Sequence, residues 1–458
     1  MLMPGSDPIS SRLRSVLVVS ASIVSASLVL AAAPLVGAAT AAAASTASPP
    51  HRVDNPYLGA RVYVNPEWSA HAVAEPGGSA VADQPTAVWL DRIAAIEGAD
   101  GAMGLRDHLD AALAQHADLV QLTLYDLPGR DCDRPAPQGE LSIDELDRYR
   151  VEFVDPIAEI VAAPRYARLR IVVIVEPNSL ANLVTHTTPR SISTYKCDEA
   201  KNRGTYLSGI GYALARLGAR PNVYPYLDIS HHGQLGWPED AVPAVSLLLQ
   251  AATIAGSTGA NVHGFVANTA NYSVLHEEYF SADDVINNQP VKWSRWVDWN
   301  PFVDEVPYAR DMRQRLIEAG FSPGIGVLID TSRNGWAGPT RPTGPAPSYE
   351  LNQFVDGSRI DRRTHLGNWC NQAGTGLGER PTAAPQTGID AYVWVKPPGE
   401  SDGASDRQSA DQYEPMCDPY YDPYGVAPTT GALPGAPPYG EWFPAHFRQL
   451  LSNAWPPL

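Results

Sequence analysis

Two short segments of the chain place acidic side chains beside groups that could hold a sugar. Segment 125–132 (YDLPGRDC) contains Asp131 next to an arginine, whose positive charge would keep the carboxylate ionised. Segment 394–402 (WVKPPGESD) places a lysine and two carboxylates, the second of them Asp402, behind a tryptophan. Glycoside hydrolysis needs an acid that protonates the leaving oxygen and a base that activates water, and flat aromatic rings suit sugar faces. The two segments therefore favour a glycoside hydrolase.

Two adjacent histidines, His231 and His232, raise the question of a metal site. Adjacent side chains point in different directions, and no third ligand is spaced nearby in the sequence. The chain also has no Gly-x-x-x-x-Gly-Lys phosphate loop and no Gly-x-Ser-x-Gly nucleophile elbow. We therefore expect no metal and no cofactor, and neither phosphate chemistry nor a serine hydrolase.

Apolar runs of strand length alternate with helical patterns, and a polar residue follows each run directly. Continuous Val/Ile/Leu runs are typical of strands buried on both faces of a parallel sheet. A polar residue can simply end a strand, but in a (β/α) barrel all these ends lie on one face, where active sites form. The repetition therefore predicts a site. The runs are 119–125, 169–175, 222–227, 262–267, 325–329 and 389–395, followed by Asp126, Glu176, Asp228, Asn268, Asp330 and Lys396.

Helical patterns between the runs indicate the fold class. Ser142 and Glu145 have the spacing of a capping box ahead of an apolar periodicity, and segments 243–255 and 306–319 also look helical. Repeated strand–helix order predicts an α/β fold, either a barrel or a doubly wound sheet. The 42 prolines and 37 glycines among 458 residues predict long, shaped loops.

The N-terminal segment has the order of residues typical of a secretory signal. Two arginines precede an apolar run at 16–36, and small residues continue to position 48. We expect residues 1–48 to be a signal peptide, cleaved between about positions 39 and 47, and residues 49–458 to form a single catalytic domain. The alternative is a membrane anchor, because the run is long. We favour a secreted protein without stable membrane insertion.

The four cysteines and the net charge indicate the redox environment of the protein and the kind of partner it can bind. An even number of cysteines in an exported chain predicts two disulfides, and the sequence leaves three pairings open. No Cys-x-x-Cys spacing points to zinc. The formal net charge of −17 argues against nucleic acid as a partner. The cysteines are Cys132, Cys197, Cys370 and Cys417.

These motifs closely resemble those of glycoside hydrolase family 6, the inverting cellulases. The resemblance implies a distorted seven-stranded (β/α) barrel, TIM-like, whose long loops enclose a substrate cleft. It also implies metal-free hydrolysis of β-1,4-glucan with inversion, and disulfides Cys132–Cys197 and Cys370–Cys417. With the long loops it favours exo-type, cellobiohydrolase-like action, and we expect a monomer that binds β-1,4-glucan or cello-oligosaccharide. The matching segments are 125–132, 176–184, 228–237, 293–300, 330–336, 368–371, 394–402 and 447–458.

The resemblance also implies roles for individual residues. Asp131 matches the aspartate that tunes the proton of the general acid, and Asp402 matches the candidate base. Tyr125 matches the tyrosine that crowds the distorted sugar at the cleavage point. The expected substrate-binding or supporting residues are Tyr125, Asp228, His231, Trp237, Asn268, Trp369, Lys396 and Glu400.

Three functional sites, with four residues in all, depart from the family pattern. The general acid is an aspartate in the family, whereas this chain has Asn178, and a carboxamide cannot donate a proton near neutral pH. General acid catalysis contributes about 10²–10⁴-fold, so its loss would be large. Pro137 and Gln138 replace a serine–asparagine pair that holds the attacking water, and Gln234 replaces a sugar-stacking tryptophan. We therefore expect impaired chemistry at catalytic position 178.

Three hypotheses follow from Asn178. In the first, Asp131 takes over as the acid through a water molecule, with slow turnover. In the second, Asn178 deamidates before the small residue Ser179 and restores an aspartate. In the third, the chain is a non-catalytic β-glucan-binding protein of the same fold.

Overall fold

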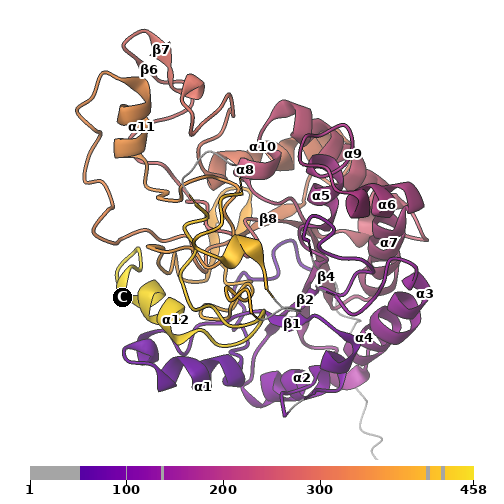
Figure 1. Cartoon of the computed structure of the whole chain (residues 1–458). Coiled ribbons are helices and arrows are strands. Elements are labelled where there is room, and N and C mark those ends of the chain that lie inside the picture. The colour runs from indigo at the N-terminus through magenta and orange to yellow at the C-terminus, as the bar shows by residue number, and fades with distance from the viewer. Residues whose placement is uncertain (1–51, 100, 136–138, 409–412, 424–428) are drawn as a thin grey trace, which may run out of the picture. The chain divides into compact units, whose positions relative to one another are not determined.

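The six apolar runs form parallel strands of one curled sheet in the computed structural model (Figure 1), which describes residues 52–99, 101–135, 139–408, 413–423 and 429–458. The order of the strands is β1-β2-β3-β4-β5-β8-β10-β9, and only β9 runs antiparallel to its neighbour in this described sheet. All six predicted strands are thus confirmed. The strands are β1 Val88–Leu90, β2 Leu119–Leu124, β3 Arg170–Val175, β4 Val223–Asp228, β5 Gly264–Ala267, β8 Gly326–Asp330, β9 Thr382–Gln386 and β10 Ile389–Val393.

The expected distorted barrel is present as a curled sheet. Seven strands are parallel, as the family resemblance implied, and the antiparallel edge strand β9 is an addition. The first and last parallel strands approach each other where the Ala87 amide donates to the Trp394 carbonyl (3.0 Å) and the Trp89 indole donates to the Val395 carbonyl (2.8 Å). The sequence did not indicate β1 or β9, because β1 is short and β9 (TAAPQ) has no apolar run.

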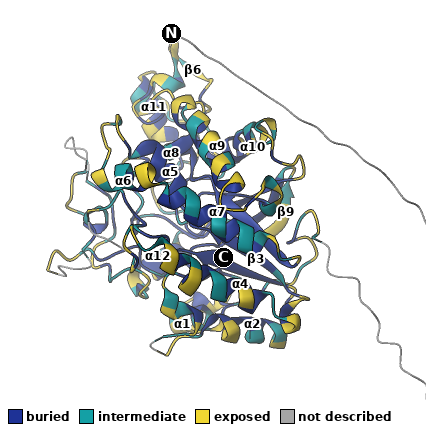
Figure 2. Ribbon diagram, turned by 90° about the vertical axis from the view of Figure 1, so that its right-hand side faces the viewer, coloured by how far each residue is buried: buried dark blue, intermediate teal, exposed yellow. Residues whose placement is uncertain are grey.

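Helices cover the outer face of the sheet (Figure 1), and most of them have buried residues on one side and exposed residues on the other (Figure 2). Apolar residues of α2, α4, α7, α9 and α10 pack with the strands in one buried cluster. The predicted helical segments are confirmed, and the one after the capping-box residues continues through a π-helical turn. The helices are α1 Pro66–Ala74, α2 Leu105–Ala114, α3 Leu146–Arg148, the π turn Tyr149–Val154, α4 Asp155–Val161, α5 Ser179–Thr185, α6 Tyr195–Arg203, α7 Thr205–Gly218, α8 His232–Leu235, α9 Pro238–Thr253, α10 Glu305–Glu318, α11 Leu351–Ser358 and α12 Pro444–Ser452.

Short elements complete the connections. A two-stranded hairpin, β6 Val285–Ile286 and β7 Gln289–Pro290, lies near α11 in a lobe beside the sheet (Figure 1). The remaining helical segments are single 3₁₀ turns at Gly78–Ala80, Ile93–Ile96, Pro164–Tyr166, Gly259–Asn261, Val291–Trp293 and Pro415–Cys417.

Side chains fill the interior of the curled sheet. A second apolar cluster lies there, and two of its tyrosines place their hydroxyl groups on buried polar partners. The Tyr226 hydroxyl donates to Asp390 (2.7 Å), and the Tyr57 hydroxyl donates to Gln121 (3.0 Å). A Cβ atom at Gly326 would lie 1.8 Å from the Asp390 carboxylate, so this strand position requires glycine. The interior is therefore a packed core, as is usual for barrels of this size.

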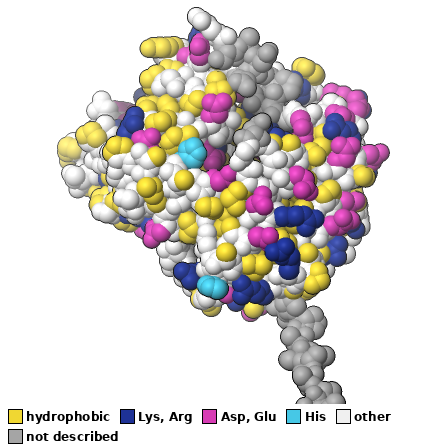
Figure 3. Space-filling view, turned by 90° about the horizontal axis from the view of Figure 1, so that it is seen from below, with side chains coloured by type: hydrophobic (Ala, Val, Ile, Leu, Met, Phe, Trp, Pro, Cys, Tyr) yellow, Lys and Arg dark blue, Asp and Glu magenta, His cyan; other side chains and the backbone are white. Residues whose placement is uncertain are grey.

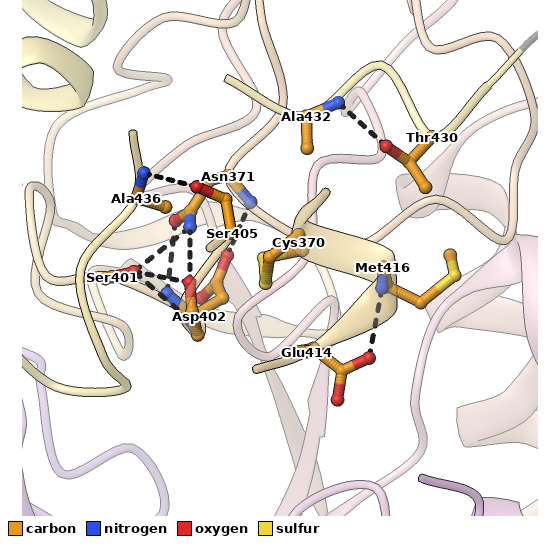
Figure 4. The surroundings of a disulfide bond; sticks show 12 residues. Cys370, Asn371, Ser401, Asp402, Ser405, Glu414, Met416, Thr430, Ala432 and Ala436 are labelled. Carbon is orange, nitrogen blue, oxygen red and sulfur yellow. Dashed lines mark hydrogen bonds between the residues drawn. A yellow bond between two sulfur atoms is a disulfide. The ribbon is translucent and has the colours of Figure 1, made fainter. Parts of the chain in front are cut away.

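Two disulfides join the loops, with the pairing that the resemblance implied. Cys132 bonds to Cys197, which ties the loop after β2 to α6. Cys370 bonds to Cys417 and holds the segment around Asp402 against its neighbours (Figure 4).

Within the described residues, no helix has the length and apolar character needed to cross a membrane. The expected signal segment 1–48 and the pair Pro137 and Gln138 lie outside the described residues. On the face seen in Figure 3, acidic, basic and hydrophobic side chains are interspersed.

Buried carboxyl groups hold irregular backbone in place. Glu277 accepts hydrogen bonds from the amides of Ile360 (2.6 Å) and Asp361 (3.0 Å), just after α11. Glu176 does the same for the amides of Asp126 (3.2 Å) and Leu127 (3.1 Å) after β2. Burial raises the pKa of Glu277 to about 8 and the pKa of Glu176 to about 7, although these amide donors favour the charged form.

We expect the Glu277→Gln substitution to change how thermal stability depends on pH. Between the unfolded pKa, about 4.3, and the raised folded pKa, the folded protein binds more protons than the unfolded chain. The contribution of Glu277 is therefore fully present below the unfolded pKa and is lost as pH rises through the folded pKa. The Tm of the variant minus that of the wild type should become more positive from pH 5 to pH 8. Scanning calorimetry across this range measures the difference, and a constant difference would contradict the raised pKa.

Candidate active site

The carboxyl ends of the parallel strands border a cleft of about 1160 Å³. Its walls come from loops that are far apart in the sequence, including those after β2, β3, β4 and β10. The structure brings most of the sequence-predicted site residues together here. Those that line the cleft are Tyr125, Asp131, Asn178, His231, Trp237, Trp369, Lys396 and Asp402.

Three other predicted residues, Asp228, Asn268 and Glu400, are not among the described side chains that line the cleft. Asn268 is fully buried, and its side-chain amide donates to the Asp330 carbonyl (2.8 Å), which links the ends of β5 and β8. A Glu400 oxygen lies 3.8 Å from the Lys396 ammonium nitrogen. Asn268 thus supports the strand ends, and Glu400 balances the charge of a cleft residue.

Asn178 lies where β3 passes into α5. Its backbone is left-handed (φ 64°). Its backbone amide donates to the Asp228 carboxylate (3.0 Å), which also accepts from the Ser230 backbone amide (3.1 Å). Asp228 therefore fixes the backbone of Asn178. Burial raises the pKa of Asp228 to about 6. The Asn178 side chain faces the cleft, where a carboxamide can donate a hydrogen bond but cannot transfer a proton.

Asp131 lies on the loop after β2, and the residue is 6% exposed. Its backbone is left-handed (φ 56°), an uncommon conformation for a residue other than glycine. The Tyr125 hydroxyl donates to Asp131 at 2.6 Å, and the Arg134 guanidinium lies 3.3 Å from the same oxygen. Arg134 also lies over the Trp369 ring, with its guanidinium carbon 4.2 Å from the centroid. The carboxylate, a cation and an aromatic face are thus held together at one point of the cleft.

Asp402 is buried in an ion pair that the sequence did not indicate. One nitrogen of Arg333 lies 2.8 and 2.7 Å from the two carboxylate oxygens, and the Tyr272 hydroxyl donates at 2.9 Å. The Asn371 amide donates at 2.9 Å, and the Asn371 side chain accepts from the Asp402 amide at 3.1 Å (Figure 4). Burial alone would raise the pKa of Asp402, but Arg333 and Lys396 hold that pKa below its usual value. Asp402 is therefore an anion near neutral pH and a weak base.

The position of the expected sugar-stacking tryptophan holds a polar network instead. The Gln234 side chain donates to Asn182 (3.2 Å) and Thr185 (3.1 Å), and it accepts from the Ser230 hydroxyl. Asn182 in turn donates to Asp133 at 2.6 Å. Gln234, Asn182, Thr185 and Asp133 all line the cleft. Sequence reasoning missed this network because its members come from the loop after β2, from α5 and from α8, which are far apart in the sequence.

A third potential ligand lies near the paired histidines in space, although none lies near them in the sequence. His231, His232 and Glu305 place one donor atom each within 4.8 Å of one another, and all three are buried. The third group comes from the start of α10, far along the chain. The His232 ring nitrogen lies 2.6 Å from a Glu305 oxygen, which is a direct hydrogen bond with no space for an ion between the two atoms. A metal-free site remains our prediction.

Comparison with known proteins points to one family. The profile of glycosyl hydrolases family 6 matches residues 59–454. Exoglucanase A of Cellulomonas fimi is 43% identical over 442 residues, which cover 90% of this chain but only 49% of that protein. A probable 1,4-beta-D-glucan cellobiohydrolase C of Aspergillus niger is 34% identical over 420 residues, which cover 88% of this chain and 78% of that protein.

Solved structures agree with the sequence matches. The catalytic domain of Cellulomonas fimi Cel6B superposes with a TM-score of 0.84 at 43% identity, covering 89% of this chain and 97% of that one. Cellobiohydrolase II (Cel6A) from Humicola insolens, in complex with glucose and cellotetraose, gives a TM-score of 0.68 at 31% identity, covering 88% of this chain and all of that one. These likenesses confirm the expected α/β architecture. The chain belongs to glycosyl hydrolases family 6.

Proposed function

We propose that this chain is a secreted enzyme that hydrolyses β-1,4-glucosidic bonds of cellulose or a related glucan, with inversion and from chain ends. One observation carries the proposal: Asp131, position 178 and Asp402 face the same cleft as the indoles of Trp237 and Trp369. The names of the relatives support it, since they are an exoglucanase and cellobiohydrolases, and one solved relative holds cellotetraose. Residues 1–48 would be removed on export.

The two aspartates have different tasks in this proposal. Asp402 stays ionised because Arg333 and Lys396 favour its charged form, so it stabilises the positive charge that develops on the sugar ring and orients the attacking water. Asp131 lies beside Tyr125, which we place against the sugar at the cleavage point. When Asp131 carries a proton, it passes that proton through a water molecule to the leaving oxygen, and the attacking water gives its own proton to Asp402. Asn178 hydrogen-bonds the same oxygen without protonating it. Turnover is therefore slow while binding is retained.

The second candidate function is glucan binding without catalysis, and Asn178 is the observation that favours it. A carboxamide has nearly the shape of a carboxyl group. An asparagine at position 178 therefore keeps the form of the cleft and removes only the proton donor. The two functions predict the same affinity for cello-oligosaccharides and differ only in turnover.

Restoring the acid should restore the rate. We expect Asn178→Asp to raise kcat on cellohexaose about 10²–10⁴-fold, the usual contribution of a general acid, with little change in affinity. Chromatography of released sugars measures the rate, and calorimetry measures binding. Asn271→Asp is the matched control, because Asn271 also lines the cleft and its side-chain oxygen accepts from Arg363 and from the Tyr272 amide, as a carboxylate would. An equal gain in both variants, or ordinary cellulase rates in a wild type shown by peptide mapping to retain Asn178, would contradict this assignment.

Removing the carboxyl group of Asp131 tests whether it supplies the residual proton. In the wild-type background, Asp131→Asn should lower the slow hydrolysis of swollen cellulose by at least about 10²-fold and leave the Kd for cellohexaose within a few-fold. If the wild type is silent and Asn178→Asp is active, the glucan-binding function holds instead. If Asp131→Asn hydrolyses as fast as the wild type, Asp131 is not the donor.

A further inference from the structure

Two tryptophans, Trp293 and Trp299, lie exposed beside one another on the loop after β7. Trp293 is 51% exposed and Trp299 is 60% exposed. Their ring centroids are 5.9 Å apart, and the ring planes are inclined by 46°. Indoles are large apolar groups that proteins usually bury, so an exposed pair marks a surface that binds something.

The loop is built to hold the pair in this place. Trp296, three residues from each, is buried in a small apolar cluster, and the Arg359 guanidinium lies 3.9 Å above its ring. The Trp299 amide donates to the Lys292 carbonyl (2.7 Å), which closes a turn and brings the two exposed indoles together. Trp299 has a left-handed backbone (φ 66°), which is unfavourable for a bulky residue. The fold therefore maintains an exposed arrangement that the chain by itself would not favour.

The loop that carries the two exposed tryptophans also borders the cleft. Trp237, which lines the cleft, donates from its indole nitrogen to the Asp298 carbonyl at 2.7 Å. Asp298 immediately precedes Trp299, and Arg295, two residues after Trp293, also lines the cleft. The loop that carries the exposed indoles thus forms part of the cleft wall together with Trp237.

We propose that Trp293 and Trp299 form an aromatic platform that binds a β-1,4-glucan chain where the chain extends out of the cleft past Trp237. This inference rests on the proposed function, because it assumes that the cleft binds the same polymer. Glucose units present flat apolar faces, and amphipathic aromatic rings suit such faces at a wet surface. The platform would extend the contact with long chains and leave short ones unaffected.

A protein partner fits the pair less well. A stable protein interface buries about 800 Å² on each side, whereas a whole tryptophan side chain provides about 150–250 Å², and about half of each indole is already covered here. Two indoles in a row match a narrow polymer better than a second globular surface.

The test compares long and short ligands with the full-length chain. We expect Trp293→Ala/Trp299→Ala to weaken adsorption on phosphoric-acid-swollen cellulose by about tenfold, which corresponds to about 1.4 kcal/mol. The Kd for cellotriose should remain unchanged, and Trp293→Tyr/Trp299→Tyr should restore most of the adsorption. Tyr349→Ala is the control, because Tyr349 is an aromatic residue that is 83% exposed on the same lobe. Calorimetric Tm values show whether each variant is folded.

The outcomes separate this inference from the proposed function. Weaker adsorption with unchanged cellotriose binding supports the platform. Wild-type adsorption by the folded alanine variant overturns the platform and leaves the proposed function intact. A wild type that binds neither ligand overturns both. If the double variant differs from the wild type in sedimentation coefficient but not in adsorption, the two tryptophans form a contact between copies of the chain. This result would overturn the platform.

Discussion

The buried ion pair between Arg333 and Asp402 is the interaction on which the geometry of the site depends. Arg333 has no exposed side-chain surface, and its partner is 7% exposed. Removing either charge would leave the other buried without compensation, which costs several kcal/mol. The Tyr272 hydroxyl and the Asn371 amide bind the same carboxylate, so loops from two further parts of the rim meet at one group. This convergence holds the anion in place before any substrate arrives.

Irregular loops can form a rigid cleft only if their backbone groups find partners. Buried amides that lack partners are costly, and long loops do not have the ladders of helices and sheets. Here carboxylates replace the ladders: Glu277 binds two amides behind α11, Glu176 binds two amides after β2, and Asp228 fixes the amide of Asn178. The disulfides add covalent limits to the same loops. The rim of the sheet is therefore shaped mainly by polar contacts, and the sheet beneath it mainly by apolar packing.

This division explains how position 178 can change without loss of the fold. The contacts of Asn178 that shape the loop run through its backbone, with a left-handed φ and the bond to Asp228. Its side chain faces the cleft, so the exchange of a carboxyl group for a carboxamide alters proton transfer and little else. Gln234 shows a different response, because it joins a polar network with Asn182 and Thr185 where a flat ring was expected. Sugar binding and bond cleavage can thus change independently in this architecture.

The sequence alone determined the regular part of the molecule. Buried parallel strands require unbroken apolar runs, so the six central strands were predictable, and so were the polar residues at their ends. The order of the motifs indicated the family, and the resemblance to that family implied the disulfide pairing, which the cysteines by themselves left open. The tertiary structure alone decided which distant residues meet: Arg333 and Asp402 are 69 positions apart, and His232 and Glu305 are 73 positions apart. It also decided that Trp296 is buried while Trp293 and Trp299 are exposed, although the three look alike in the sequence. The physical reason is that helices and strands repeat with a period that leaves a pattern in the sequence. Loops have no such period, and the positions of their residues depend on how the curled sheet brings the strand ends together.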